Sequence, residues 1–303
     1  MNFKGKTVLV TGGTGFIGSF LVEALLDMGA KVRVTMRSEN FRALSERRGE
    51  IEWMRGDLRD PDYALQLVEG ADVVFHLASC RRNIEYHVKK CADVAAENVR
   101  MSLAILEAIR EYPTRVVFFS TANVPPNPDI TALAQGDKVD GYVLGKILCE
   151  SLWFAAAKQR EFPLLVVRPV GVYGPRDTFA TDGNIIPALM VRARAADSEL
   201  EVWGDGTQER AFLYVEDVVG SILGLVEADA RGVQYVTSND VVTVKQVAEC
   251  VVNLVKPSLK IRFNPEKQVG ARRVPDLPLH EVVSEYAWTP FEEGLKKTYE
   301  SWK

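Results

Sequence analysis

The stretch TVLVTGGTGFIG at residues 7–18 decides the fold predicted for this chain of 303 residues. Its β-branched opening run is typical of a buried strand, and apolar residues recur at helical spacing over 16–28. Gly12, Gly15 and Gly18 stand between the strand and the helix. A strand, a glycine-rich turn and a helix in immediate succession predict a binding site for a dinucleotide.

Each glycine of this turn has a physical reason. Gly12 permits the tight turn, Gly15 lets a pyrophosphate approach the backbone, and Gly18 lets the helix pack closely on the strand. The start of the helix, at Phe16 and Ile17, offers unpaired N–H groups and a positive dipole end to the phosphates. We therefore predict that these five residues bind the cofactor.

Strands and helices continue to alternate through the first half of the chain. Asp60 is expected to cap a helix that has Pro61 at its first position, and a long helix is expected at about 89–110. Further strands are expected at 32–36, 51–55, 73–77, 115–119 and 164–167. This alternation predicts an α/β fold of Rossmann type, a doubly wound parallel sheet with helices on both faces.

The composition excludes several classes of protein. Hydrophobic residues make up 47% and charged residues 26%, as in globular rather than disordered chains. Lys and Arg number 37 against 41 Asp and Glu, a formal charge of −4 without the basic patch of a nucleic-acid binder. Apolar runs stay short of a bilayer span, and the 4 cysteines and 3 histidines are dispersed. We expect a cytoplasmic, metal-free protein without membrane or nucleic-acid partners.

The end of the second predicted strand favours one dinucleotide over the other. An acidic residue at this place would hydrogen-bond the ribose 2′-hydroxyl of NAD. The sequence here reads Thr-Met-Arg-Ser over 35–38, with Arg37 in place of a carboxylate. A guanidinium fork suits a 2′-phosphate, so NADP(H) is favoured over NAD(H).

The chain is predicted to form two parts, one that binds the cofactor and one that binds the substrate. Residues 1–170, with roughly 211–238, are expected to form the NADP-binding Rossmann domain. The last third is rich in proline and poorer in strands, so roughly 171–210 and 239–303 are expected to form a smaller, interleaved C-terminal lobe that binds substrate.

A tyrosine and a lysine one helical turn apart are the candidate catalytic pair. Tyr142 and Lys146 lie four residues apart in YVLGK, on one face of a predicted helix. The lysine and an oxidised nicotinamide would favour the phenolate and lower the pKa of the tyrosine. At the end of the strand at 115–119, Thr121 rather than Ser120 is expected to hold a substrate oxygen against Tyr142.

Several motifs occur in an order that resembles the extended short-chain dehydrogenase/reductase family, in its branch of nucleotide-sugar epimerases, dehydratases and reductases. Besides the glycine turn and YVLGK, they are GDL at 56–58, HLAS at 76–79, RPVGVYGP at 168–175, GDGTQERAFLYVEDV at 204–218 and RRVPD at 272–276. The resemblance covers essentially the whole chain. It implies a nucleotide-diphosphate sugar as substrate, and a homodimer formed through the helices at about 140–160 and 89–110.

The resemblance also implies roles for individual residues. Asp57 and Leu58 would contact the adenine end of the cofactor, and Lys146 its nicotinamide ribose. The HLAS segment would line the dinucleotide path with Leu77, Ala78 and Ser79. Substrate would be bound by Thr121, Asn123, Asn184, Arg210 and Arg273, with the arginines on the diphosphate.

Departures from the family pattern limit the reaction. Ala122 and Asn123 stand where dehydratases carry an Asp-Glu pair, and Asn123 and Asn184 stand where the C3,C5-epimerising reductases carry Cys and His. Gly171 replaces an Asn that often contacts substrate. We therefore expect a 4-epimerase that works through a keto sugar. The alternatives are an NADPH-dependent reductase of a nucleotide 4-keto-6-deoxy sugar, a reductase of a non-sugar ketone, and a catalytically silent NADP(H) sensor.

Overall fold

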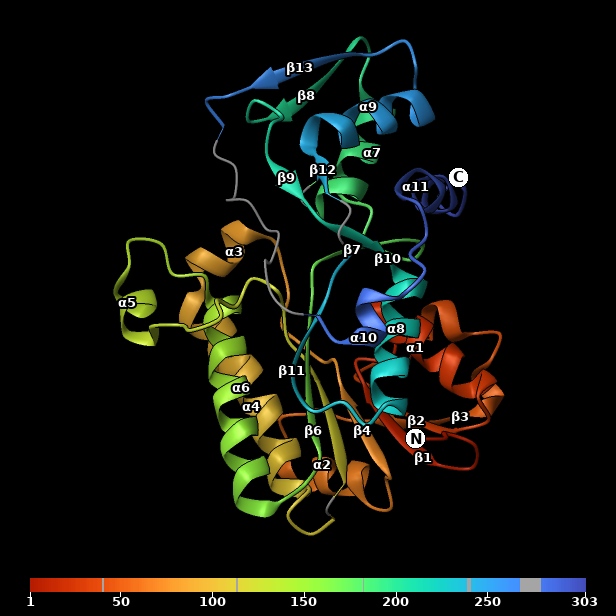
Figure 1. The fold of residues 1–303 in the computed structure, drawn as a ribbon, viewed down its shortest axis with the longest axis vertical. Coiled ribbons are helices and arrows are strands. Elements are labelled where there is room, and N and C mark those ends of the chain that lie inside the picture. Colours follow the sequence, from red (N-terminus) through yellow and green to blue (C-terminus); the bar gives the residue numbers. More distant parts are fainter. Residues whose placement is uncertain (40, 113, 182, 239–240, 268–278) are drawn as a thin grey trace. The chain divides into compact units, whose positions relative to one another are not determined.

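The structure, a computed structural model, describes residues 1–303 except 40, 113, 182, 239–240 and 268–278 (Figure 1). The chain divides into two compact units. The first unit consists of Met1–Arg168 and Ile222–Gln234, and the second of Pro169–Ser221 and Tyr235–Lys303. The cofactor-binding and substrate-binding roles given to the two parts stay predictions.

The first unit is built on a sheet with the strand order β11-β6-β5-β4-β1-β2-β3. Its strands are β1 (Thr7–Thr11), β2 (Lys31–Met36), β3 (Ile51–Arg55), β4 (Val73–His76), β5 (Arg115–Phe119), β6 (Leu164–Pro169) and β11 (Gly232–Val236). All pairings from β6 to β3 are parallel. The order reverses beside β1, so the doubly wound sheet predicted from the sequence is confirmed. Open α/β sheets bind ligands at such a reversal, outside the carboxyl ends of the strands.

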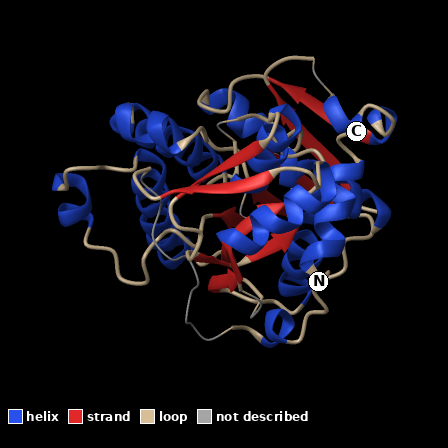
Figure 2. Cartoon of the chain, turned by 90° about the horizontal axis from the view of Figure 1, so that it is seen from above, coloured by secondary structure: helices blue, strands red, loops and turns tan. Residues whose placement is uncertain are grey.

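Helices flank the strands of this sheet, as the view from above shows (Figure 2). They are α1 (Phe16–Asp27), α2 (Pro61–Val68), α4 (Cys91–Ala108) and α6 (Gly141–Arg160). The unit also contains α3 (Ile84–Lys89) and α5 (Ile130–Gln135), which contact α6, and residues 222–227 of α8 (Val215–Glu227). The Asp60 carboxylate caps α2 by accepting from the N–H groups of Asp62 and Tyr63, as its sequence predicts. The long helix expected at about 89–110 is confirmed as α4, Cys91–Ala108, and the short helix α3 ends just before it at Lys89.

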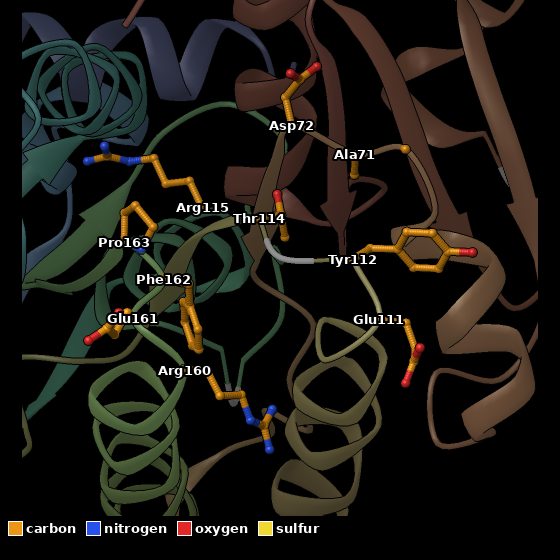
Figure 3. Close-up of a pocket in the computed structure, with 11 residues that line it drawn as sticks. Ala71, Asp72, Glu111, Tyr112, Thr114, Arg115, Arg160, Glu161, Phe162 and Pro163 are labelled. Atoms are coloured by element: carbon orange, nitrogen blue, oxygen red, sulfur yellow. The ribbon is translucent and has the colours of Figure 1, made fainter.

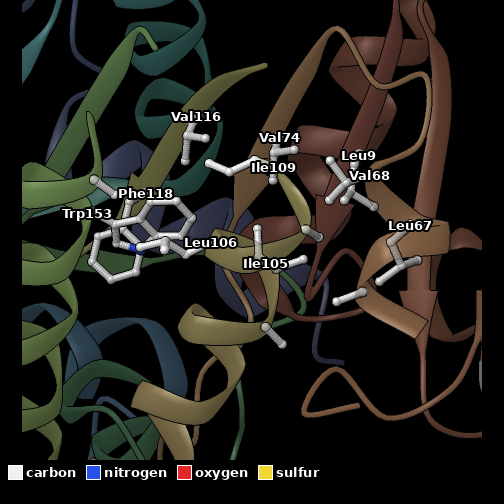
Figure 4. Packing of buried hydrophobic residues seen from close by; sticks show 14 of the residues in the cluster. Leu9, Leu67, Val68, Val74, Ile105, Leu106, Ile109, Val116, Phe118 and Trp153 are labelled. Atoms are coloured by element: carbon white, nitrogen blue, oxygen red, sulfur yellow. The ribbon is translucent and has the colours of Figure 1, made fainter. Parts of the chain in front are cut away.

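The core of the first unit lies between the sheet and helices α2, α4 and α6 (Figure 4). Leu9, Val74 and Phe118 point from the strands toward Ile105 of α4 and Trp153 of α6, and all five side chains are buried. Full burial of an aliphatic side chain of this size contributes about 1.5–3 kcal/mol. This packing holds α6 against the sheet.

The second unit contains short strand pairs and helices. Its elements are β7 (Gly171–Tyr173), α7 (Ile185–Ala195), β8 (Glu199–Trp203), β9 (Glu209–Arg210), β10 (Phe212–Tyr214), β12 (Val242–Thr243), α9 (Val244–Val255), β13 (Lys260–Asn264), α10 (Glu281–Ser284) and α11 (Phe291–Glu300). Strands β10 and β7 pair in parallel, as do β13 and β8, whereas β12 and β9 are antiparallel. Among all described residues, no helix is both long and apolar enough to cross a membrane.

Candidate active site

The glycine turn after β1 is as close-packed as its predicted role requires. Gly12 has a φ of +72°, and a Cβ on it would lie 2.9 Å from the amide nitrogen of Ala78. A Cβ on Gly18 would lie 2.2 Å from the carbonyl oxygen of Gly12. Gly15 is the N-cap of α1, so no side chain covers the N–H groups of Phe16 and Ile17 at the helix start. This cradle fits a dinucleotide pyrophosphate.

The segment after β4 is tied to the glycine turn through the last residue of β1. Ala78 donates its N–H to Oγ1 of Thr11 over 3.1 Å, and Leu77 donates to the Thr11 carbonyl over 3.2 Å. The Ser79 hydroxyl donates to Oδ1 of Asn98 over 2.9 Å. Leu77 and Ala78 therefore border the cradle, and Ser79 follows them directly in the chain.

His76 supports this arrangement from the core. Its Nδ1 lies 2.8 Å from Oγ1 of Thr11 and its Nε2 lies 3.1 Å from Oγ of Ser102. Burial, reinforced by the charge of Lys146, lowers the pKa of His76 to about 3. The imidazole is therefore a neutral hydrogen-bonding group at pH 7.

The ends of β2 and β3 bring two predicted cofactor residues near each other. Arg37, directly after β2, is exposed, and its charge is among the causes that lower the pKa of Asp57 to about 2. The largest cause is Arg59, whose Nε lies 2.9 Å from Oδ1 of Asp57. Asp57 is thus held in a turn, while Leu58 beside it is buried.

Helix α6 carries the predicted catalytic pair at its start. Asp140 is the N-cap, and its carboxylate accepts from the N–H groups of Tyr142 and Val143. Tyr142 is partly buried and Lys146 is fully buried, at 3% exposure. The Lys146 ammonium donates to the carbonyl of Phe119, the last residue of β5, over 2.5 Å, and lies 5.7 Å from the centre of the Tyr142 ring.

The electrostatics of this pair differ from the sequence expectation. Burial raises the pKa of Tyr142, and the charge of Arg81, rather than Lys146, opposes that rise. Burial also lowers the pKa of Lys146, to about 8. The ammonium points at a backbone carbonyl, so the expectation that it lowers the pKa of Tyr142 is not met by these side-chain positions.

Thr121 and Ser120 have different surroundings at the end of β5. The Ser120 hydroxyl donates to Glu150 of α6, which also binds Arg168 of β6 through Nε at 3.0 Å and Nη2 at 2.5 Å. Thr121 accepts from the N–H of Asn123 over 3.2 Å. Because Ser120 belongs to a buried network, Thr121 is the better candidate for a substrate contact.

The predicted substrate residues beyond β6 lie in the second unit or outside the described chain. Asn184 stands at the N-cap position of α7 without a capping hydrogen bond from its side chain, and its amide donates to both carboxylate oxygens of Asp177, at 3.1 and 3.0 Å. Arg210 ends β9 and is partly buried. Arg273 lies within 268–278, outside the described residues.

A cavity of about 580 Å³ lies in the first unit, at the amino ends of its central strands and so opposite their carboxyl ends (Figure 3). Asp72, Arg115 and Pro163, which line it, lie at the amino ends of β4, β5 and β6. Every catalytic and cofactor residue predicted from the sequence lies instead at the carboxyl ends of strands or at the helix starts that follow them.

Three residues that lie on α6, at its N-cap or against it were not identified from the sequence: Asp140, Glu150 and His87. Asp140 carried a usable signal, because an acidic residue just before a helical run is a common N-cap. Glu150 and His87 carried none: the first looks like a surface charge on a helix, and the second like a lone polar residue. Only the fold brings Glu150 to Arg168 and stacks His87 on Tyr142.

A Rossmann-type sheet with a glycine cradle after β1 and a Tyr–Lys helix beside β5 defines a nicotinamide-dinucleotide-dependent enzyme. The chain belongs to the NAD dependent epimerase/dehydratase family, whose model matches residues 8–239.

Similar proteins act on nucleotide sugars. The chain is 31% identical to a dTDP-4-dehydro-6-deoxy-D-allose reductase of a Streptomyces species, over 98% of this chain and 96% of the relative. Identity is 30%, with the same coverage, to the enzyme of that name from Streptomyces bikiniensis. A solved UDP-N-acetylglucosamine 4-epimerase from Methanobrevibacter ruminantium is 23% identical, covers 99% of this chain and 98% of its own, and superposes with a TM-score of 0.84. This last likeness shows the fold alone.

Proposed function

We propose that this chain reduces the C4 keto group of a nucleotide-diphosphate 4-keto-6-deoxy sugar with NADPH. The observation that carries the proposal is the partly buried Tyr142 on the same helix as the buried Lys146, whose ammonium donates to Phe119, two residues before Thr121. When bound, the dinucleotide would supply the hydride. Tyr142 would donate its phenolic proton to O4 of the sugar, and the Thr121 hydroxyl would hydrogen-bond the same oxygen.

The remaining residues would bind and orient the two ligands. Lys146 would stabilise the phenolate that forms as Tyr142 loses its proton, and would bind the nicotinamide ribose. The glycine cradle would hold the pyrophosphate. The other cofactor contacts would be Arg37, Asp57, Leu58, Leu77, Ala78 and Ser79, and the other sugar-nucleotide contacts Asn123, Asn184, Arg210 and Arg273.

Two observations favour reduction over epimerisation, which the sequence alone placed first. Arg37 at the end of β2 suits the 2′-phosphate of NADPH, a cofactor that a reductase must exchange at every turnover. The two relatives at 31% and 30% identity are both named as reductases of a 4-keto-6-deoxy sugar.

A 4-epimerase is the second candidate. Ala122, Asn123 and Asn184 supply no ionisable group for water elimination or for C3,C5 chemistry, whereas redox chemistry at C4 needs only the Tyr–Lys pair. In this case the keto sugar would turn in the site and be reduced on its other face, without net consumption of cofactor.

Turnover assays distinguish these candidates. Purified protein is incubated with a panel of nucleotide sugars and 4-keto-6-deoxy derivatives, with and without NADPH. One NADPH oxidised per keto sugar supports the reductase, and an epimer formed without net oxidation supports the epimerase. Inactivity on the whole panel, with NADPH still bound, would favour the silent sensor. Light scattering on the same preparation checks the expected homodimer.

Two substitutions test the assigned residues. Tyr142→Phe should abolish turnover but keep dinucleotide affinity, with the exposed Tyr112→Phe as its control; an active Tyr142→Phe enzyme would refute the assignment. Arg37→Ala should weaken NADPH binding far more than NADH binding, with the exposed Arg231→Ala as control. Equal loss for both dinucleotides would reverse the NADP(H) preference.

A further inference from the structure

His87 lies against the candidate catalytic tyrosine, although nothing in the reaction assigns it a role. It belongs to α3, a short helix on which Ile84 and Tyr86 are 58% and 42% exposed. The His87 side chain is instead buried, at 5% exposure. Its ring stacks on Tyr142, with ring centres 5.2 Å apart and planes inclined by 16°. One face of the phenol is therefore covered by an imidazole rather than by water.

Both edges of the imidazole are held. The N–H of Arg82 donates to Nε2 of His87 over 2.9 Å. Because Nε2 accepts, the proton of the neutral ring resides on Nδ1. Nδ1 lies 3.5 Å from Oδ1 of Asp140, the carboxylate that caps α6 and accepts from the N–H of Tyr142. The ring thus connects the segment after β4 with the start of the catalytic helix.

Burial, more than the neighbouring charges, keeps the imidazole neutral. Burial lowers the pKa of His87 below its ordinary value, the Asp140 carboxylate opposes that shift, and the Arg81 charge adds to it. The same two charges act on the phenol, since Arg81 lowers and Asp140 raises the pKa of Tyr142. Lys146, one turn further along α6, lies 5.7 Å from the centre of the phenol ring.

We propose that His87 is a positioning residue for Tyr142: its stacked, neutral ring fixes the plane of the phenol and keeps water from one of its faces. This inference rests on the proposed function, in which Tyr142 passes the proton to O4 of the sugar. His87 takes no part in the proton transfer, because Nε2 already accepts a hydrogen bond and Nδ1 faces Asp140. Aromatic stacking contributes geometric restraint of this kind, and misplacing a catalytic group by about 1 Å can cost about 100-fold in rate.

Three variants separate positioning from packing. His87→Ala removes the stacked ring, whereas His87→Phe keeps a ring but leaves the Arg82 N–H without its acceptor. Tyr86→Ala, an exposed neighbour on α3, is the matched control. For each we measure kcat and KM with a 4-keto sugar and NADPH, the dependence of kcat on pH, dinucleotide affinity and the melting temperature.

His87→Ala should lower kcat by about 10- to 100-fold with KM unchanged within about threefold, because the restraint acts on the reacting phenol rather than on binding. In reduction the phenol donates its proton, so the rate falls as pH rises through the pKa of Tyr142. Water admitted to the phenol favours the phenolate, so this fall should begin at lower pH in His87→Ala. His87→Phe should keep kcat and the pH profile close to wild type but melt earlier.

Three results would overturn the inference: an unchanged kcat in folded His87→Ala, a loss confined to KM, or a His87→Phe variant as slow as His87→Ala. Tyr142→Phe distinguishes this failure from failure of the proposed function. If Tyr142→Phe is inactive while His87→Ala is normal, only the positioning role is wrong. If Tyr142→Phe turns over normally, the proposed function itself is wrong.

Discussion

Removing the carboxylate of Glu150 should destabilise the first unit severely. Glu150 and Arg168 form an ion pair in which each side chain is 6% exposed. The same carboxylate accepts the Ser120 hydroxyl, so two buried groups share it through three hydrogen bonds. Glu150→Ala would remove the carboxylate partner of a buried guanidinium and the acceptor of a buried hydroxyl.

The magnitude follows from that burial. Breaking a buried ion pair by removing one partner costs about 3–5 kcal/mol, because the remaining charge is desolvated without compensation. An exposed pair contributes about 0–1 kcal/mol. Lys245→Ala, which removes a partner 3.9 Å from Glu249 where both side chains are well exposed, therefore serves as the control. A domain is stable by only about 5–15 kcal/mol, so the expected loss is a large share of it.

Urea unfolding followed by far-UV circular dichroism measures the effect. We expect Glu150→Ala to lose about 3–5 kcal/mol and Lys245→Ala less than about 1 kcal/mol. The double variant Glu150→Met, Arg168→Met should recover much of the loss, because no isolated charge remains. A loss below about 1 kcal/mol in Glu150→Ala, or a double variant less stable than both single ones, would refute the reasoning.

Three further predictions concern the cradle and the end of β5. Gly18→Ala should abolish dinucleotide binding in titration calorimetry, since the new Cβ would lie 2.2 Å from the Gly12 carbonyl oxygen; wild-type affinity would contradict the cradle. Thr121→Val should lower kcat by about 100-fold, whereas Ser120→Ala should lower the free energy of unfolding by about 1 kcal/mol and change kcat little. A large loss of kcat in Ser120→Ala together with a normal kcat in Thr121→Val would assign the substrate contact to Ser120 instead. Burial lowers the pKa of Lys146 from 10.5 to about 8, so the unfolded state binds its proton more tightly and wild-type stability should rise between pH 8 and 10.5. Urea unfolding at a series of pH values measures this. The free energy of unfolding of Lys146→Met should lack that rise and should exceed that of the wild type at pH 7. The same dependence of this free energy on pH in both proteins would contradict the lowered pKa of Lys146.

Local chemistry made much of the fold predictable from sequence. The strand, glycine turn and helix at 7–18 are one continuous segment, and the Asp60–Pro61 helix start is decided by neighbouring backbone groups. The Tyr142–Lys146 spacing is likewise local, so the shared helix could be predicted. The long helix expected at about 89–110 was predictable from periodicity in the same way, and α4 spans Cys91–Ala108.

Long-range contacts account for most of what was missed. Glu150 meets Arg168 because α6 and β6 are held together by the fold, and no spacing rule connects the two positions. The direction of the Lys146 side chain was missed for the same reason. Sequence places it one turn from Tyr142, but the carbonyl that accepts its hydrogen bond belongs to Phe119 on β5. Proximity along a helix therefore predicted the partnership but not the electrostatics.

The buried ammonium of Lys146 is itself an argument that the end of β5 is a working site. A side chain needed only for packing would be apolar here, because burial destabilises the charged form of Lys146. The carboxylate of Glu150 raises the pKa of Lys146, but burial outweighs it, and that carboxylate is hydrogen-bonded to Ser120 and Arg168. The hydrogen bond to the Phe119 carbonyl and the Glu150 charge do not offset the burial of this ammonium, which therefore lowers stability at neutral pH. Such a cost is expected where a site must stabilise charge that develops only during reaction.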